Sequence, residues 1–519
     1  MRGNEMTDIA NKRNSFPFFL LIGILGWFAA ALFSMQFTRL NLDEPWYLTA
    51  SHLVMQMQLP YRDFVFTQLP LLPYVYGAIL EFTGINLATG RFVSVAFSTL
   101  AVTLAIALAR RAAGNWAAIL TIIGLLLTPS VLCYLVIVKT YALTAALTLF
   151  ALYLMFHDHP QVSSAVPVIS SLASGLAAFT RISFALLTVL VFFYWIGRGK
   201  WKESGLGLTG LALPIIGFAY QSNGNFFFDV IEFHQRTTIQ PFTQIVAESP
   251  KTTLVIQTLL AFTPAVMLGL VLLVIGLRSR TARDRLLSWW MAKSRANFVW
   301  LSTSIILFGV HFVTWGNLWE YQVPVYLIII PLLAAFAAVV MQSVKRQIGV
   351  FLLFAEVMVI ASLPSWFFQT NSIFWDSVST VSVAAKQAAA LAQYGTVHDQ
   401  VLGVYNHLAL AAGKGIPLGN EMGLFSITTE LSPEEARVRK FLVETDVTRL
   451  LSECSVPFAI TNTNQMLFMK SSPSGQPLKS PVQELWRAWL QKNYRIIYND
   501  DYTTIFQRRF DKCDDGRVE

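Results

Sequence analysis

The sequence predicts a polytopic α-helical membrane protein with about eleven transmembrane helices and a C-terminal α/β domain outside the membrane. The 519-residue chain is 55% hydrophobic and only 13% charged, and its mean hydropathy is +0.53. A soluble protein of this length needs a far more polar surface. Several apolar stretches also reach about 18 to 22 residues, the length that crosses a hydrocarbon core of about 30 Å. After residue 367 the sequence becomes polar.

Length and hydropathy place the transmembrane helices. They are expected near 15–35, 91–110, 115–134, 139–156, 164–180, 182–197, 204–221, 253–277, 298–315, 322–342 and 347–367. The first run is longer than the hydrophobic region of a signal peptide, and no small-residue cleavage site follows it before Asp43. It is therefore expected to stay in the membrane as a helix.

Basic clusters between the apolar runs predict the orientation. They read "NKRN", "ARRAAG", "GRGKWK", "LRSRTARDRLLSWWMAKSR" and "VKRQ". If the N-terminus is cytoplasmic, all of them fall on the inner face, as the positive-inside rule requires. This placement explains the net charge of +8 without a nucleic-acid partner. It puts the loops 36–90 and 222–252, and everything after about 368, on the outer face.

The C-terminal segment shows short alternating strands and helices. "DQVLGVYN" and "VPFAITN" have strand composition, and "YRIIYNDDYTTIFQRR" predicts a β-hairpin that turns at 499–501. "SPEEARVRKFLVETDVTRLLSEC" predicts a helix whose capping box is formed by Ser432 and Glu435. The expected domains are therefore a transmembrane domain, 1–367, with juxtamembrane segments at 36–90, and a periplasmic or extracytoplasmic α/β domain, 368–519.

Two adjacent acids, Asp43 and Glu44, stand where the first apolar run ends. Pro45 suits the first turn of a helix, and Asp43 suits its N-cap. Apolar residues then recur at helical spacing, so one interpretation is that Asp43 caps an amphipathic helix in the membrane interface. The other is functional. Acids that face a cavity at this depth usually act in binding or catalysis, and a carboxylate here is placed to take a proton from an acceptor hydroxyl or amine.

The segment after these acids is rich in proline and aromatic residues. Pro60, Pro70 and Pro73 divide it into short pieces. Irregular backbone at this depth is tolerated where it lines a cavity or packs on protein.

Several motifs of nucleotide- and metal-binding enzymes are missing from the sequence. The P-loop, HExxH and the DxD of nucleotide-sugar transferases do not occur, and the three cysteines form no CxxC pair. The sequence therefore indicates no particular cofactor. A divalent metal ion is one option, because Asp43, Glu44 and Glu320 are able to share an ion if they come together.

The stretch "LDEPWY…LPYRDF…QLPLLPYVYGAILEFTG…ATGRFVSVAFSTLAVTLAIALARRAAG" resembles the start of GT-C glycosyltransferases. The similar groups are the protein O-mannosyltransferases, the lipid A aminoarabinose transferases and the rhizobial galacturonosyltransferase-like proteins. They share an Asp-Glu pair in the first outer loop, a Pro-rich juxtamembrane segment and an arginine at the start of the second helix, here Arg91. "WGNLWEYQVPVYLIIIPLLAAFAA" resembles a late helix of the family, and the resemblance covers residues 15–365.

The resemblance implies a multi-pass glycosyltransferase of the inner (cytoplasmic) membrane that acts in cell-envelope glycan biosynthesis. A hexosyl or pentosyl group passes from a polyprenyl-phosphate donor to a lipid, glycan or protein acceptor on the outer face. Asp43 is then the catalytic base, and Glu44 positions the acceptor or holds Asp43 ionised. The implied ligands of the donor phosphate are Arg181, Lys139, Arg62 and Arg91, and those of the acceptor or sugar are Tyr61, Gln68, His234, Arg236, Glu320 and Tyr321.

The chain departs from the family at two places. Several members carry a lysine before Pro-Pro where this chain reads "QLP", and some carry an aspartate at the outer start of the fourth helix, where it reads "KT". The phosphate contacts are therefore expected to be rearranged. Snorkelling at a helix end is the structural alternative for Arg181 and Lys139, and an ordinary loop position is the alternative for His234.

Two other functions remain open from the sequence. A transporter or flippase of lipid-linked glycans predicts two related halves or broken helices in corresponding positions, and the sequence shows neither. A non-catalytic assembly protein predicts that the acids only cap a helix.

Overall fold

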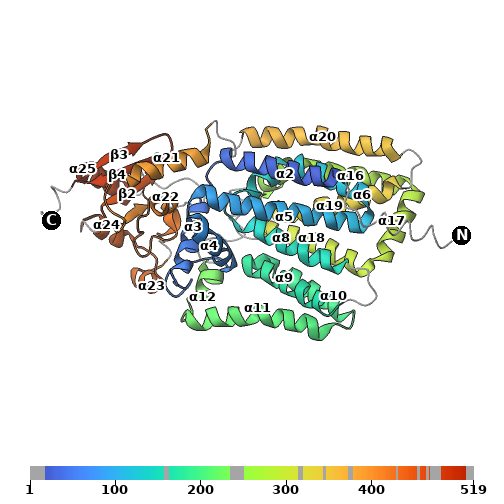
Figure 1. Ribbon diagram of the computed structural model, residues 1–519, viewed down its shortest axis with the longest axis horizontal. Helices are drawn as coiled ribbons and strands as arrows, with labels where there is room; N and C mark the ends of the chain where they lie inside the picture. The colour runs from blue at the N-terminus through green and yellow to red at the C-terminus, as the bar shows by residue number, and fades with distance from the viewer. Residues whose placement is uncertain are drawn as a thin grey trace.

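The computed structural model describes residues 18–156, 163–233, 251–313, 319–342, 347–371, 378–427, 431–452, 456–462, 467 and 481–509. Figure 1 shows long helices that run roughly parallel along the longest axis, with a small sheet packed at one end of them. A short helix, α17, lies across the opposite end.

The helical part comprises residues 18–371. In chain order its helices are α2 (Phe18–Phe37), α3 (Glu44–Met55), α4 (Leu71–Thr83), α5 (Leu87–Ala113), α6 (Asn115–Leu126), α7 (Pro129–Leu135), α8 (Thr140–Met155), α9 (Ala165–Thr180), η1 (Ile182–Phe184), α10 (Ala185–Ile196), α11 (Trp201–Gln221), α12 (Asn225–Phe227), η2 (Phe228–Glu232), α15 (Lys251–Ala261), α16 (Thr263–Arg278), α17 (Arg280–Ala292), α18 (Ser294–Val313), η3 (Trp319–Gln322), α19 (Val323–Met341) and α20 (Gln347–Asn371).

Each expected transmembrane range coincides with a helix or a broken pair of helices. Among the described residues, four single helices are long and apolar enough to cross a membrane, or up to six spans if each bent pair counts as one. The bent pairs are α6–α7 and α15–α16, with bends of 76° and 88°. The helical membrane class is therefore confirmed, while the number of eleven spans stays a prediction.

Burial separates inner from outer helices. In the apolar window of α19, 83% of the residues are buried, against 28% in the windows of α2 and α20. Figure 1 shows α2 and α20 along one edge and α11 along the other, with α5 and α19 between them. The exposed residues of the outer helices are large and apolar, for example Leu25 and Leu363, as a lipid-facing surface requires.

The juxtamembrane helices α3 and α4 flank the irregular segment 56–70. Its side chains Tyr61, Phe64 and Phe66 are buried, which confirms that the Pro-rich segment packs on protein. The alternative interpretation of this segment, an amphipathic interface helix with a polar outer face, does not fit the burial of α3. Both Thr49 and Ser51, which the helical spacing places on the polar face of α3, are buried. This is possible because each hydroxyl donates to the carbonyl four residues back, at 2.8 Å.

The C-terminal part contains a four-stranded sheet in the order β1-β2-β4-β3. Its elements are α21 (Thr380–Ala392), β1 (Val401–Gly403), α22 (Asn406–Ala411), η4 (Gly423–Phe425), α23 (Pro433–Val438), α24 (Glu444–Ser452), β2 (Phe458–Asn462), α25 (Pro481–Asn493), β3 (Tyr494–Asn499) and β4 (Thr503–Arg508). β1 and β2 are parallel, and the pairs β2–β4 and β3–β4 are antiparallel.

The predicted strands and the hairpin are all present, but the predicted helix after Ser432 is broken. The Ser432 hydroxyl accepts a hydrogen bond from the Glu435 N–H as expected, and α23 then ends at Val438. Lys440 has a positive φ of 65°, which a continuing α-helix does not allow. In the hairpin turn, the Asp500 carboxylate accepts hydrogen bonds from the N–H groups of Tyr502 and Thr503.

One buried cluster joins the two parts of the molecule. It contains Trp46 of α3, Tyr76 of α4, Leu408 of α22 and Phe458 of β2. The C-terminal part therefore packs directly on the juxtamembrane helices. It lies at the same end of the helix bundle as Asp43 and Glu44.

Candidate functional site

Asp43 lies immediately before α3 and does not cap it. The preceding loop is held by Asn41, whose side-chain oxygen accepts a hydrogen bond from the Asp43 N–H at 3.1 Å. Asp43 occupies the N-cap position, and Pro45 lies in the first turn as predicted, but the Asp43 side chain makes no capping hydrogen bond. Its carboxylate instead contacts Lys139 Nζ at 2.7 Å. The interpretation of the Asp43 carboxylate as a helix-capping group is therefore wrong, although the residue does occupy the N-cap position.

Lys139 bridges two acids that are distant in the sequence. It precedes α8, and its ammonium lies 2.7 Å from Asp43 and 2.6 Å from Glu320 Oε1. The Tyr141 hydroxyl donates to the same glutamate oxygen at 3.2 Å. The side chains of Lys139 and Glu320 are 5% and 8% exposed, whereas that of Asp43 is 24% exposed. Asp43 is thus the acid of this cluster that a second molecule reaches most easily.

These acids do not fit a shared divalent ion. The ammonium of Lys139 already lies between the carboxylates of Asp43 and Glu320, and the third acid, Glu44, is paired with Arg91. Within the described ranges, no group of three or more His, Cys, Asp or Glu side chains is arranged to hold a metal ion.

Arg181 lies beside this cluster and keeps a free donor. It follows α9, and its Nη1 donates to the Thr140 hydroxyl at 3.3 Å. The guanidinium lies over the rings of Tyr141 and Tyr321, 5.1 Å and 4.7 Å from their centroids. Its buried Nε has no hydrogen-bond partner in the described part of the chain. An arginine that aromatic rings hold in place while a donor remains unused is suited to binding an anion.

Arg91 has no donor left for a phosphate, contrary to the role that the resemblance implies. It pairs with both carboxylate oxygens of Glu44 at 2.8 and 2.7 Å. Its remaining N–H groups donate to the carbonyls of Met35, Thr38 and Arg39. Both side chains of the Arg91–Glu44 pair have an exposure of 0%. Arg91 therefore anchors the end of α2 and the start of α3.

Glu44 acts on the cluster through the backbone rather than by contact with a substrate. Its Oε1 accepts a hydrogen bond from the Val138 N–H at 3.0 Å, and Val138 directly precedes Lys139. Its Oε2 accepts one from the Asn41 N–H at 2.9 Å. Glu44 thereby fixes the chain on both sides of the Asp43–Lys139 contact. Because it is buried, it does not fit the expected direct contact with an acceptor.

The other expected residues fall into four groups. Glu320 and Tyr321 lie in the cluster around Lys139. Tyr61 is buried and donates to the Gln68 carbonyl at 2.6 Å, so it fits a packing role better than a sugar contact. Arg62 pairs with Asp63 at an exposed position, away from the cluster around Lys139. His234 and Arg236 lie outside the described residues.

Tyr141 is the residue of the cluster that the sequence interpretation missed. It contacts Glu320 and stacks under Arg181. The available signal was the run Lys139-Thr140-Tyr141, in which three polar side chains open an apolar helix.

Comparison with known structures identifies the fold. No protein-family model matches the chain, and no curated protein matches its sequence. The crystal structure of ArnT from Cupriavidus metallidurans bound to undecaprenyl phosphate is similar, with a TM-score of 0.61 and 15% identity over 94% of this chain and 97% of that one. The apo structure of the same protein matches with a TM-score of 0.61 and 16% identity, over the same 94% and 97%. The oligosaccharyltransferase of Archaeoglobus fulgidus matches with a TM-score of 0.47 and 14% identity, over 86% of this chain and 68% of that one. The similarity to the two ArnT structures shows that the chain has the GT-C fold that the sequence resemblance implied.

Proposed function

We propose that this chain is a glycosyltransferase of the inner membrane that transfers a sugar from a polyprenyl-phosphate donor to a glycolipid, glycan or protein acceptor on the outer face. The GT-C fold supports this class, and the similar ArnT structure contains undecaprenyl phosphate. The observation that carries the proposal is the arrangement of Asp43. Its carboxylate leaves the capping position empty, pairs with a buried lysine and remains partly exposed.

In this proposal Asp43 is the catalytic base. Its carboxylate takes the proton from the acceptor hydroxyl or amine while the acceptor oxygen or nitrogen forms a bond to the anomeric carbon of the donor sugar. The bond between that carbon and the phosphate oxygen breaks, and polyprenyl phosphate leaves as an anion. Lys139 holds Asp43 at 2.7 Å, so the carboxylate is positioned before the acceptor binds.

Arg181 is the preferred ligand of the leaving phosphate. Lys139 is nearly enclosed by two carboxylates, whereas Arg181 has a free Nε. A cation next to the leaving oxygen stabilises the charge that develops in the transition state. We assign Lys139 mainly to positioning, with Tyr141 and Glu320 completing the cluster.

The test compares cell-envelope glycans by mass spectrometry in a deletion strain that carries wild-type, Asp43→Asn or Asp63→Asn protein at equal membrane levels. Asp63 is a matched control, because it lies in the same outer segment and pairs with exposed Arg62. We expect a sugar-sized mass to be lost in the deletion strain, restored by wild type and Asp63→Asn, and not restored by Asp43→Asn. Removing a general base is expected to lower the rate about 10²–10⁴-fold. Full restoration by Asp43→Asn would refute its assignment as the base.

A further inference from the structure

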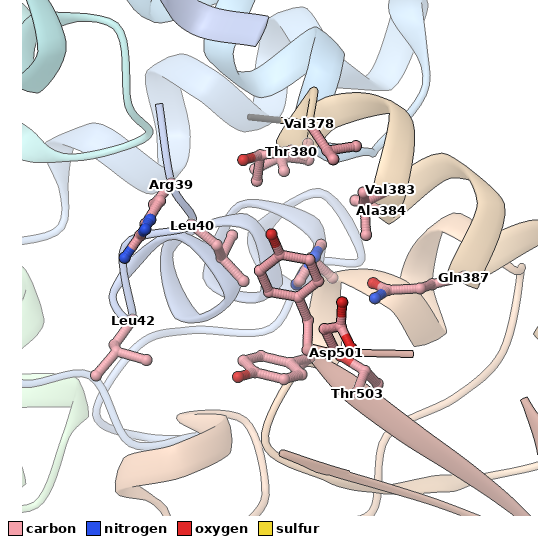
Figure 2. Close-up of a pocket in the computed structure, with 14 residues that line it drawn as sticks. Arg39, Leu40, Leu42, Val378, Thr380, Val383, Ala384, Gln387, Asp501 and Thr503 are labelled. Carbon is pink, nitrogen blue, oxygen red and sulfur yellow. The ribbon is translucent and has the colours of Figure 1, made fainter. Parts of the chain in front are cut away.

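A cavity lies at the junction between the helical part and the C-terminal part. Figure 2 shows Arg39, Leu40 and Leu42 of the first outer segment on one side and side chains of α21 on the other, with Asp501 and Thr503 of the hairpin below. The cavity has a volume of about 360 Å³ and is lined also by Leu87, Tyr405 and His407. A volume of this size suits a small ligand.

His407 is a buried lining residue whose ring nitrogens lack hydrogen bonds to the described part of the chain. Its side chain is 2% exposed, and neither ring nitrogen has a hydrogen-bond partner in the described part of the chain. Burial lowers the pKa of His407 to about 3, and the nearby charge of Arg91 acts in the same direction. The imidazole is therefore uncharged, with one N–H donor and one acceptor nitrogen. Both are left unpaired, which is unfavourable unless a ligand or water meets them.

Thr380 is a second lining residue with an unsatisfied polar group. Its hydroxyl is buried and has no partner among the described residues, and it lines the same cavity. The rest of the lining is mainly apolar or aromatic, including the rings of Tyr405 and Tyr502. Arg39 and Asp501 have opposite charges, and the other lining residues are uncharged.

We propose that this cavity binds a neutral, hydroxyl-rich ligand, namely a sugar residue of the acceptor. A sugar hydroxyl donates and accepts hydrogen bonds, so it is able to satisfy both the imidazole of His407 and the hydroxyl of Thr380. The C–H face of a sugar ring packs on an aromatic ring. The cavity has no excess of positive charge that would bind an anion. An apolar ligand would leave the buried polar atoms unpaired. The assignment of this sugar to the acceptor rests on the proposed function. The preference of the cavity for a saccharide rests only on its lining residues.

The cavity is tied to the Asp43 cluster through one short segment. Leu42 lines the cavity, and the next residue, Asp43, contacts Lys139. Arg91 holds the backbone of this segment at Thr38 and Arg39. A sugar bound in the cavity therefore packs against the segment that carries the proposed base, which suits the binding of an acceptor longer than one sugar.

The test is saturation-transfer NMR on the full-length protein in nanodiscs without any donor. The probes are the methyl glycosides of glucose, galactose, mannose and N-acetylglucosamine. We expect at least one glycoside to receive saturation from the wild type, with at least a tenfold loss of affinity in His407→Phe and in Ala384→Trp. Ala384 is a buried lining residue of α21, and the neighbouring Ala385 is exposed, so Ala385→Trp is the matched control and is expected to bind normally.

Thermal unfolding separates loss of binding from loss of folding. His407→Phe removes a polar group that has no partner, so it is expected not to lower the unfolding temperature. Glycoside signals that are absent, or equal in wild type and both cavity variants, would overturn the proposal and indicate a water-filled cavity. Asp43→Asn is expected to bind glycosides normally while it fails in the glycan assay, so the two proposals fail independently.

Discussion

At the scale of single residues, the buried Arg91–Glu44 pair sets the geometry on which the Asp43 cluster depends. Arg91→Met removes one partner and leaves Glu44 buried and unpaired, with an exposure of 0%. We expect a loss of about 3–5 kcal/mol in the free energy of unfolding, measured as a lower unfolding temperature in detergent. Activity is expected to fall with it, because Glu44 also holds the Val138 N–H beside Lys139.

Arg62→Met is the control for this prediction. Arg62 also pairs with an acid, Asp63, but its side chain is 47% exposed. Solvent screens such a pair, so little change in unfolding temperature is expected. If the two variants unfold at similar temperatures, the Arg91–Glu44 pair is not the anchor described above.

Glu421 gives a prediction about pH. This glutamate is buried after α22, and burial raises its pKa from an ordinary value of 4.5 to about 7. The folded state then binds the proton more tightly than the unfolded state. The free energy of unfolding therefore falls as the pH rises from about 4.5 through about 7, and the contribution of Glu421 to this fall is up to about 3 kcal/mol.

Glu421→Gln removes the titrating group and keeps the acceptor oxygen that bonds to the Gly419 N–H. We expect the variant to unfold at a higher temperature than wild type at pH 8 and at a similar temperature at pH 4.5. An equal difference at both pH values would show that Glu421 does not titrate in this range.

At the scale of secondary-structure elements, α4 packs closely on α3, and the two helices flank the irregular segment 56–70. A Cβ on Gly77 would lie 2.5 Å from the Ser51 carbonyl oxygen, so Gly77→Ala forces the two helices apart. We expect a destabilisation of about 1–3 kcal/mol, seen as a lower unfolding temperature. Gly217→Ala is the matched control, because a Cβ there meets nothing within 4 Å. The packing is looser than described if both variants behave alike.

The sequence predicts elements better than their contacts. Hydropathy finds the long helices because lipid requires apolar residues over a fixed length. Strand composition and turn residues likewise find the hairpin. The break after α23 was missed, because it depends on a positive φ at Lys440, and lysine carries no local signal for that conformation.

Several residues of the candidate site can be predicted from the sequence, but the contacts between them cannot. Asp43, Lys139 and Glu320 stand out as charges in an apolar sequence. The partner of each is set by tertiary contacts, however, and Lys139 and Glu320 are 181 positions apart. The phosphate role that the resemblance implies for Arg91 does not fit the structure, because the sequence does not reveal the carbonyls that take up its donors. A lone histidine such as His407 gives no sequence signal at all.

At the scale of the whole molecule, basic segments and the candidate site lie at opposite ends. Trp289 Nε1 of α17 donates to the Ala112 carbonyl at 2.8 Å, and Lys293 Nζ to the Arg111 carbonyl at 3.4 Å. Arg295 also donates to the Gly197 carbonyl. The basic segment 277–295 thus contacts two other basic segments that the positive-inside rule assigns to the cytoplasm. Figure 1 places α17 at the end opposite the sheet.

This arrangement predicts that the sheet and Asp43 face outward, and cysteine labelling checks the orientation. The background carries Cys454→Ser and Cys513→Ser, while Cys133 is buried. Lys386→Cys lies on exposed α21, and Lys202→Cys lies on the exposed start of α11. In right-side-out vesicles, a membrane-impermeant maleimide is expected to label position 386 and not 202; in detergent it is expected to label both. The two ends of α5, a helix about 40 Å long, then lie on opposite sides of the membrane. Labelling of position 202 in intact vesicles would reverse the orientation, and it would place the proposed transfer on the cytoplasmic face.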